Sequence, residues 1–420
     1  MITDSPGPSG TAASPERLTD PKLYRDDDPF ALYAALRRDA PVAWHEGAGF
    51  WAVTTHPEVA AIGTDPETFC SANGILVEEI GSSYDSPPTM MHTDPPQHTR
   101  YRRLVQPGFK PSMVRLMEAG VGKKARALID LIEPGAPVDV VPALSIPVPL
   151  QVICELLGVD GEQWPRFYEW SEAVIPGESE RSAESRQQLQ AEMWGYLIGV
   201  ANERRVSPAD DLVSVLATAH TNGAPRDGAG SVDSAGSDAA DDGRLSEAEL
   251  AMFLIQLLVA GNETTRNLIS GGLAALAEHP EQWAALRADR GLIPSAVEEL
   301  LRWTTPVISF MRTATRPTVL RGQAIAEGDP VLLIYASANR DESVFGPDAD
   351  SLRVDRHPNP HLSFGFGPHF CLGAALARLE ARAVLSLLLD RFATIEPAGP
   401  IERTSSPVIA GVRHAPLVFA

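Results

Sequence analysis

The sequence has few cysteines and no long apolar run, and each shortage excludes a class of protein. Its 3 cysteines among 420 residues are too sparse, and odd in number, for a disulfide framework. The longest apolar run, residues 250–261, is too short to span a membrane and contains Gln256. The first residues, MITDSPGPSG, lack the basic and apolar regions of a secretory signal. We therefore expect a cytoplasmic protein without a membrane segment.

Basic residues are also scarce. The chain has 35 Lys and Arg against 55 Asp and Glu, which gives a formal net charge of −20. Because nucleic-acid binding needs clustered Lys and Arg, we expect no nucleic-acid partner. An acidic balance most often keeps a protein soluble, and we expect a monomer.

The composition changes along the chain indicate one folded domain with two unstructured pieces. Residues 1–20 are rich in Ser, Pro, Thr and Asp and are expected to form a disordered tail. Residues 221–243 are rich in Gly, Ala, Ser and Asp and are expected to form a disordered loop. Residues 21–420 are then a single domain.

The apolar periodicity predicts a mainly α protein with a minor β part. Helices are expected from Asp28, from Pro57, over HTRYRRLV, over SAVEELLRW and after Cys371. A long helix should begin at a capping box formed by Ser246 and Glu249 and run to Pro280. At 1.5 Å per residue it would be roughly 45 Å long, enough to cross a domain. The expected strands are FWAVTTH, TVLRG, AIAEG and VLLIYAS.

The segment FGFGPHFCLG carries the clearest chemical signal, because it sets Cys371 among glycines just before a helix. The helix dipole and free N–H groups there favour a thiolate, so the pKa of this thiol should fall. Glycines let the backbone approach a flat partner closely. The flanking side chains, which we expect to shield the sulfur from water, are Phe364, Phe366, Phe370 and Leu372.

Cys371 could be a zinc ligand, a nucleophile, a haem ligand or an incidental residue, and these uses differ in what else they need. A zinc site needs three or four ligands, and no second cysteine lies nearby. A nucleophile would want a base, and His369 two residues away need not converge on it. Haem iron needs only one protein ligand, and a thiolate favours O–O cleavage. An incidental cysteine in a Gly-rich loop also fits. Cys70 and Cys154 are expected to be small buried side chains.

FGFGPHFCLG resembles the haem-binding signature of the cytochrome P450 family, Phe-x-x-Gly-x-x-x-Cys-x-Gly, at Phe364, Gly367, Cys371 and Gly373. Three more segments match in the same order, so the resemblance extends from about Asp28 to the C-terminus. It implies the cytochrome P450 fold, with a long central helix over haem b. It also implies that Cys371 is the axial iron ligand.

AGNETTRN places a glycine and polar residues in the middle of an apolar helix, where Gly costs about 1 kcal/mol relative to Ala. A close helix–helix crossing with a surface-facing Glu would explain this. The segment also resembles the family's oxygen-activation motif. By that resemblance Ala260 and Gly261 border the haem, Thr264 hydrogen-bonds dioxygen, and Glu263 helps relay protons from water.

EELLR places Glu299 and Arg302 three residues apart on a helix, and a surface pair at this spacing stabilises little. The segment resembles the family's Glu-x-x-Arg motif, a buried structural ion pair behind the haem loop. The third arginine of that network is often found where this chain has Ser351, followed by Leu352. Arg356 is one candidate to complete it.

Haem propionates need cationic partners, and the resemblance implies His98, Arg102, Arg312 and His369. HTRYR places His98 and Arg102 four residues apart on one helical face. Arg312 lies on a probable strand, and His369 lies in the signature itself. Each residue taken alone would more often be a solvated surface group.

The resemblance implies a haem-thiolate monooxygenase that inserts one oxygen atom from O2 into a lipophilic small molecule, such as a sterol, terpenoid, polyketide or branched lipid. Electrons would come from a separate ferredoxin or flavodoxin and its NAD(P)H reductase. That partner would dock beneath Cys371, where Arg102, Arg103 and Lys110 could form a basic patch. Another haem-thiolate oxidation, such as epoxidation or oxidative coupling, and a non-catalytic haem-binding protein are the alternatives.

By the family's layout, the substrate pocket lies on the other face of the haem. Most of the side chains at the corresponding positions are aliphatic, which suits a lipophilic substrate, although they could equally belong to the core. These candidates are Ile75, Leu76, Val77, Met90, Leu257, Val307, Ile308, Val408 and Ile409.

Overall fold

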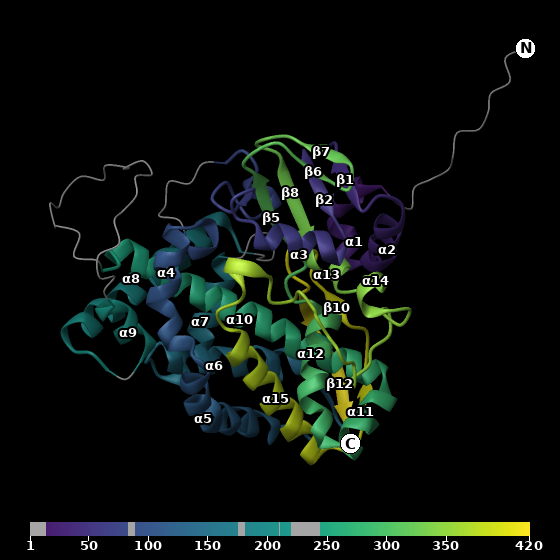
Figure 1. Ribbon diagram of the computed structural model, residues 1–420. Coiled ribbons are helices and arrows are strands. Elements are labelled where there is room, and N and C mark those ends of the chain that lie inside the picture. Colours follow the sequence, from purple (N-terminus) through teal and green to yellow (C-terminus); the bar gives the residue numbers. More distant parts are fainter. Residues whose placement is uncertain (1–13, 83–88, 175–180, 210, 220–243) are drawn as a thin grey trace, which may run out of the picture.

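Helices make up most of the chain, and the strands form small sheets, so the prediction of a mainly α fold with a minor β part is confirmed (Figure 1). The predicted loop at 221–243 and the first thirteen residues of the predicted tail lie outside the described residues. The computed structural model describes residues 14–82, 89–174, 181–209, 211–219 and 244–420.

The helices agree with the predicted segments at each place where the apolar period is strong. Their bounds are α1 Pro21–Arg25, α2 Pro29–Asp39, α3 His56–Thr64, α4 Gln97–Val105, α5 Pro111–Ile129, α6 Pro147–Leu156, α7 Trp164–Val174, α8 Ala183–Val206, α9 Leu212–Thr218, α10 Glu247–Glu278, α11 Pro280–Ala288, α12 Ile293–Thr304, α13 Tyr335–Ala338, α14 Glu342–Phe345 and α15 Ala374–Arg391.

The largest sheet has five strands in the order β1-β2-β8-β5-β3, with β2 and β8 parallel and the other pairs antiparallel. A three-stranded sheet has the order β4-β12-β9, and two hairpins pair β6 with β7 and β10 with β11. The strands are β1 Val42–His45, β2 Phe50–Val53, β3 Phe69–Cys70, β4 Pro137–Asp139, β5 Ser309–Ala314, β6 Thr318–Leu320, β7 Gln323–Ile325, β8 Pro330–Ile334, β9 Ile395–Pro397, β10 Glu402–Arg403, β11 Val412–His414 and β12 Pro416–Phe419.

Two predicted boundaries are wrong. The disordered tail cannot extend to residue 20, because Pro15–Thr19 forms a 3₁₀ helix whose Leu18 is buried in the core around α2. The strand predicted over VLLIYAS ends at Ile334, since Tyr335–Ala338 turns into the short helix α13. The Tyr335 carbonyl accepts a helical hydrogen bond from Asn339 N at 2.8 Å, which removes it from the sheet.

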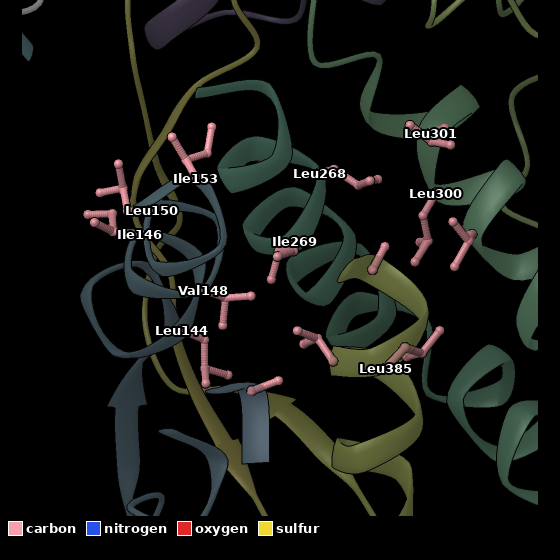
Figure 2. Packing of buried hydrophobic residues seen from close by; sticks show 14 of the residues in the cluster. Leu144, Ile146, Val148, Leu150, Ile153, Leu268, Ile269, Leu300, Leu301 and Leu385 are labelled. Atoms are coloured by element: carbon pink, nitrogen blue, oxygen red, sulfur yellow. The ribbon is translucent and has the colours of Figure 1, made fainter. Parts of the chain in front are cut away.

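The long central helix α10 organises the helical part of the fold. Its predicted capping box is confirmed: Ser246 N donates to Glu249 Oε2 at 2.7 Å, and Glu249 N donates to Ser246 Oγ at 3.1 Å. Leu268 and Ile269 in its middle are buried, with α6 on one side and α12 and α15 on the other (Figure 2). The residues on either side of Thr264 are therefore held in a rigid frame.

Among the described residues, no helix combines the length and apolar character that crossing a bilayer would require.

Candidate active site

The loop that carries Cys371 joins a 3₁₀ turn, Gly367–His369, to α15. It is closed by a hydrogen bond from Cys371 N to the Phe364 carbonyl at 2.8 Å. Gly367 has φ +68°, and a Cβ there would clash with the main chain of Gly63 at the end of α3. Only glycine fits this position, because it needs both a left-handed backbone and close contact with α3.

The expected lowering of the Cys371 pKa is not found in the chain alone. Burial raises the pKa of Cys371, and the backbone N–H groups of Gly373 and Ala374 with the charges of Arg102 and Arg378 offset this only in part. In the chain alone, the loss of hydration on burial therefore raises the thiol pKa by more than the start of the helix lowers it.

The aromatic shield is also only partly present. Phe366 and Phe370 are 46% and 40% exposed, so they lie at the surface of the loop rather than over the sulfur. Phe364 is half-buried, with the Arg378 guanidinium 4.4 Å from its ring centroid. Of the other cysteines, Cys154 is fully buried as predicted, whereas Cys70 is only half-buried.

Arginine and histidine side chains from three segments, α4, β5 and the turn before Cys371, converge near this loop. His98 on α4 is 2% exposed, and its ring centroid lies 4.2 Å from that of His369. Arg312 on β5 is buried, and Arg102 lies close enough to Cys371 to feel the charge of the thiolate. Burial, followed by the charges of Arg312, His98 and Arg102, lowers the pKa of His369 to about 3. The structure thus brings together the cations that the sequence placed far apart.

This cluster has unused hydrogen-bonding capacity. His98 Nε2 is buried and has no hydrogen-bond partner among the described residues. The nearest carboxylate that affects it, Asp94, already accepts hydrogen bonds from the N–H groups of Ser71 and Ala72 at 2.9–3.0 Å. Two arginines and two histidines that can donate hydrogen bonds, gathered beside a thiol, are suited to an anionic ligand.

The middle of α10 has one uncovered strip. Ala260 is exposed, and Gly261 and Thr264 are half-buried, although the neighbouring Asn262 and Glu263 are buried. A Cβ on Gly261 would clash with Cδ1 of Ile153 on α6. The helix-crossing explanation therefore accounts for this glycine.

Thr264 uses its hydroxyl proton within its own helix. Its Oγ donates to the Ala260 carbonyl at 2.7 Å, which leaves the oxygen lone pairs free to accept. In this conformation the Thr264 hydroxyl could only accept a hydrogen bond from a ligand. Such a bond to the carbonyl four residues earlier is common for Ser and Thr in helices.

Glu263 points in a different direction from Thr264, because successive residues of a helix are about 100° apart. Its carboxylate pairs with Arg266 and accepts from Asn267 Nδ2 at 2.9 Å. Arg266 also pairs with Glu172 on α7 at 3.1 Å. The pair of Glu263 with Arg266 was predictable, because the two residues have the same i,i+3 spacing as Glu299 and Arg302. The pair of Arg266 with Glu172 was not predictable, because Glu172 lies on another helix.

A thiol in a Gly-rich loop, a cation cluster beside it and a long helix with an uncovered strip occur together in this chain. The cytochrome P450 family model matches residues 224–416. Cytochrome P450 126 of Mycobacterium tuberculosis is 41% identical over 94% of this chain and 95% of that protein. The chain belongs to the cytochrome P450 family. Linalool 8-monooxygenase of Pseudomonas putida is 35% identical over 96% of this P450 and 98% of that enzyme.

Solved structures of other proteins also support membership of the cytochrome P450 family. Cytochrome P450 CYP109Q5 from Chondromyces apiculatus has a TM-score of 0.83 at 33% identity and covers 96% of this P450 and 97% of that chain. This P450 is therefore a monooxygenase, an oxidoreductase with haem b as its cofactor. The fit of this chain to haem rests on the buried, unpartnered His98 Nε2 and on the cations grouped near the Cys371 thiol.

The Glu299–Arg302 pair of this P450 is fully buried. Arg302 Nε and Nη2 each donate to a Glu299 carboxylate oxygen at 2.8 Å, and both side chains are 0% exposed. Arg302 Nη1 also donates to the carbonyls of Asn339 and Ala349. Ser363, next to Phe364, donates to the Leu301 carbonyl at 2.7 Å. These bonds tie α12 to the start of the cysteine loop.

Arg356 is the residue that completes this network. Its Nε donates to both Glu299 oxygens at 3.1 Å, and its side chain is only 5% exposed. Sequence reasoning missed two further donors to Glu299, Asn359 Nδ2 at 3.1 Å and Arg353 N at 2.9 Å. A backbone donor leaves no signal in the residue types of a sequence.

The segments predicted to form the substrate pocket are partly brought together. The Ile75 carbonyl accepts from Met311 N at 2.8 Å, and Ile308 N donates to the Val408 carbonyl at 2.7 Å. Met90 N donates to Gln256 Oε1 on α10 at 3.2 Å. Ile75, Met90 and Ile308 are buried. The other candidates are half-buried: Leu76, Val77, Leu257, Val307, Val408 and Ile409.

Proposed function

We propose that this P450 inserts one oxygen atom from O2 into a C–H bond of a small lipophilic molecule of terpenoid, sterol, polyketide or branched-lipid type. Two observations support this substrate class. The candidate pocket segments that lie together are aliphatic, and the chain is 35% identical to a linalool monooxygenase. The half-buried Thr264 hydroxyl on the uncovered strip of α10 is the observation that carries the reaction type.

The residues at the site have separate roles in this proposal. Cys371 would bind the haem iron, and His98, Arg102, Arg312 and His369 would bind the propionates. Phe364, Gly367 and Gly373 would shape the loop, and Ala260 and Gly261 would border the haem. When bound, haem supplies the redox chemistry of oxygen activation, while the protein orients the substrate and controls protons.

We assign the proton supply to the ion-pair chain on α10. Glu172 is 21% exposed at its side chain, Arg266 bridges it to Glu263, and Glu263 is 3% exposed. Arg266 would hold both carboxylates in place, and Glu263 would take protons from water and turn toward Thr264 to deliver them. The Thr264 hydroxyl, whose proton is donated to the Ala260 carbonyl, would accept a hydrogen bond from a water at that point.

The electron donor would be a ferredoxin or flavodoxin served by an NAD(P)H reductase. Its docking surface would be the face around the cysteine loop, to which the exposed Arg103 and Lys110 and the exposed Phe366 and Phe370 would contribute. Arg102 is half-buried near Cys371 and would contribute to haem binding instead. This proposal places the protein in the cytoplasm, where the reductant is available.

Turnover with linalool and a surrogate ferredoxin system tests the function. We expect NADPH consumption coupled to a singly oxygenated product. Thr264→Ala should keep the spectral shift on substrate binding while a larger share of NADPH is consumed without product. Equal coupling in Thr264→Ala and the parent protein would contradict the role of Thr264. Haem-loaded protein that forms no oxygenated product from linalool or a wider set of lipophiles would contradict the function.

A further inference from the structure

Two short segments that carry candidate walls of the substrate pocket are attached to different parts of the fold. The first contains Ile75, whose carbonyl accepts a hydrogen bond from Met311 N on β5 at 2.8 Å. The second contains Met90, whose N–H donates to Gln256 Oε1 on α10 at 3.2 Å. The spacing between these two wall segments therefore depends on what joins the sheet side to the helix side.

One side-chain pair, Glu79 and His92, joins the two segments directly. Glu79 ends the 3₁₀ turn Val77–Glu79, and His92 ends the 3₁₀ turn Met90–His92. His92 Nε2 lies 3.1 Å from Glu79 Oε1 and 3.3 Å from Oε2. The His92 and Glu79 side chains are only 14% and 16% exposed. The contact is therefore sheltered from solvent and should be stronger than a surface pair.

Glu79 also fixes the backbone of the first segment. Its Oε2 accepts from Ile75 N at 2.7 Å and from Leu76 N at 3.0 Å. A Cβ at Gly74, which has φ +112°, would lie only 3.1 Å from Glu79 Cβ, so the side chain packs closely against the turn. Two backbone N–H groups of candidate pocket residues and one imidazole thus share a single carboxylate.

The imidazole of His92 is held at its other nitrogen as well. Thr89 Oγ1 lies 2.8 Å from His92 Nδ1 and hydrogen-bonds to it. In the neutral ring, Nε2–H donates to Glu79 while Nδ1 accepts from the Thr89 hydroxyl. In the protonated ring, both nitrogens donate, and the Thr89 oxygen accepts. Thr89 therefore orients the ring toward Glu79 in either protonation state.

We propose that Glu79 and His92 are positioning residues of the substrate pocket. Their pair holds the wall at Ile75 and Leu76 at a fixed spacing from the wall at Met90, and so sets how well a lipophilic ligand fits between them. Glu79 and His92 act on the ligand through these walls and not by contact. The inference rests on the proposed function, which supplies the pocket.

Binding of two iron ligands to the haem-loaded protein, followed by absorption spectroscopy, tests this role. Imidazole reaches the iron with little contact to the pocket walls, whereas 4-phenylimidazole must also fit between them. The Kd of 4-phenylimidazole divided by that of imidazole therefore reports on the walls and cancels changes at the haem. His92→Phe keeps an aromatic ring but removes its hydrogen bonds, so this ratio should rise about 3- to 10-fold.

Three further variants complete the design. His92→Gln keeps a donor nitrogen that can reach Glu79, so the ratio should stay within about 2-fold of the parent value. His414→Phe removes a histidine–carboxylate pair elsewhere, on β11, where His414 Nδ1 lies 2.7 Å from Asp139 Oδ2, and should leave the ratio unchanged. If His92→Phe does not fold, Thr89→Val, which removes only the hydroxyl beside the ring, should raise the ratio about 2- to 5-fold.

Four results would each overturn the proposal. They are an unchanged ratio in folded His92→Phe or, failing that, in Thr89→Val; an equal rise in His414→Phe; equal rises in His92→Phe and His92→Gln; and a parent protein that binds imidazole but not 4-phenylimidazole. The titrations need haem but no turnover. A protein that gives the expected ratios yet forms no oxygenated product would contradict the proposed function alone.

Discussion

Replacing Glu299 by glutamine should destabilise this P450 severely, because Glu299 is the shared acceptor of a buried network. Its carboxylate accepts from Arg302, Arg356 and Asn359 at 2.8–3.1 Å and from Arg353 N at 2.9 Å. Glutamine preserves the shape but supplies only one acceptor oxygen and no charge. Arg302, which is 0% exposed, would then keep at most one of its two bonds to residue 299 beside its main-chain carbonyl partners, and its charge would be left unpaired.

The expected cost follows from this burial. Removing one partner of a buried ion pair typically costs about 3–5 kcal/mol, because the other charge stays buried without compensation. That is a large part of the roughly 5–15 kcal/mol that stabilises a typical protein. Since the network ties α12 to the start of the cysteine loop through Ser363, haem should also be lost more readily.

The adjacent residue offers a matched control. Glu298 accepts from Arg378 at 2.7 Å through both oxygens, but its side chain is 29% exposed. Glu298→Gln should therefore cost less than Glu299→Gln, about 1–3 kcal/mol. Urea unfolding followed by circular dichroism, together with loss of the haem absorption band, measures both variants. If Glu299→Gln is no less stable than Glu298→Gln, the structural role of Glu299 is refuted.

Three further predictions concern stability. Gly367→Ala should lower the free energy of unfolding by at least about 2 kcal/mol, because the left-handed backbone and the contact with Gly63 both exclude a Cβ; a loss below 0.5 kcal/mol in urea unfolding would contradict this. Gly261→Ala should lower the free energy of unfolding by about 1–2 kcal/mol in the parent protein. The same change should cost little in Ile153→Val, because valine lacks the methyl group that clashes. Equal costs in the two backgrounds, measured as a double-mutant cycle, would show that the helix crossing is not the constraint. Hydrogen bonds with His361 and Arg378 lower the pKa of Glu298 from 4.5 to about 2. The stability that ionised Glu298 contributes is therefore present above about pH 4.5 and lost as the pH falls toward 2. Glu298→Gln should flatten this part of the pH–stability curve, and an unchanged curve would contradict the assignment.

Local patterns in the sequence were enough to predict most of the helical fold. The capping box of Ser246 and Glu249 and the long apolar period after it fix α10 without reference to the rest of the chain. The expected disorder up to residue 20 was wrong because Leu18 packs against distant residues. The polar composition of this segment gives no sign that one of its residues, Leu18, is buried in the core.

The candidate site was predictable mainly through its resemblance to a family, not through geometry. The sequence indicated the arginines and histidines near Cys371, and the structure brings them together from three segments. It could not indicate that Thr264 donates back to Ala260 or that Phe366 faces solvent. Those outcomes depend on side-chain direction, which residue spacing alone does not fix.

The identity of the iron ligand is the central claim, and one spectrum tests it most directly. The protein, expressed with ample haem supply, is reduced, exposed to carbon monoxide and examined by absorption spectroscopy. We predict the band typical of thiolate ligation in the parent protein and its loss in Cys371→Ala. A histidine-type band in the parent protein, or a thiolate band that persists in Cys371→Ala, would contradict the account.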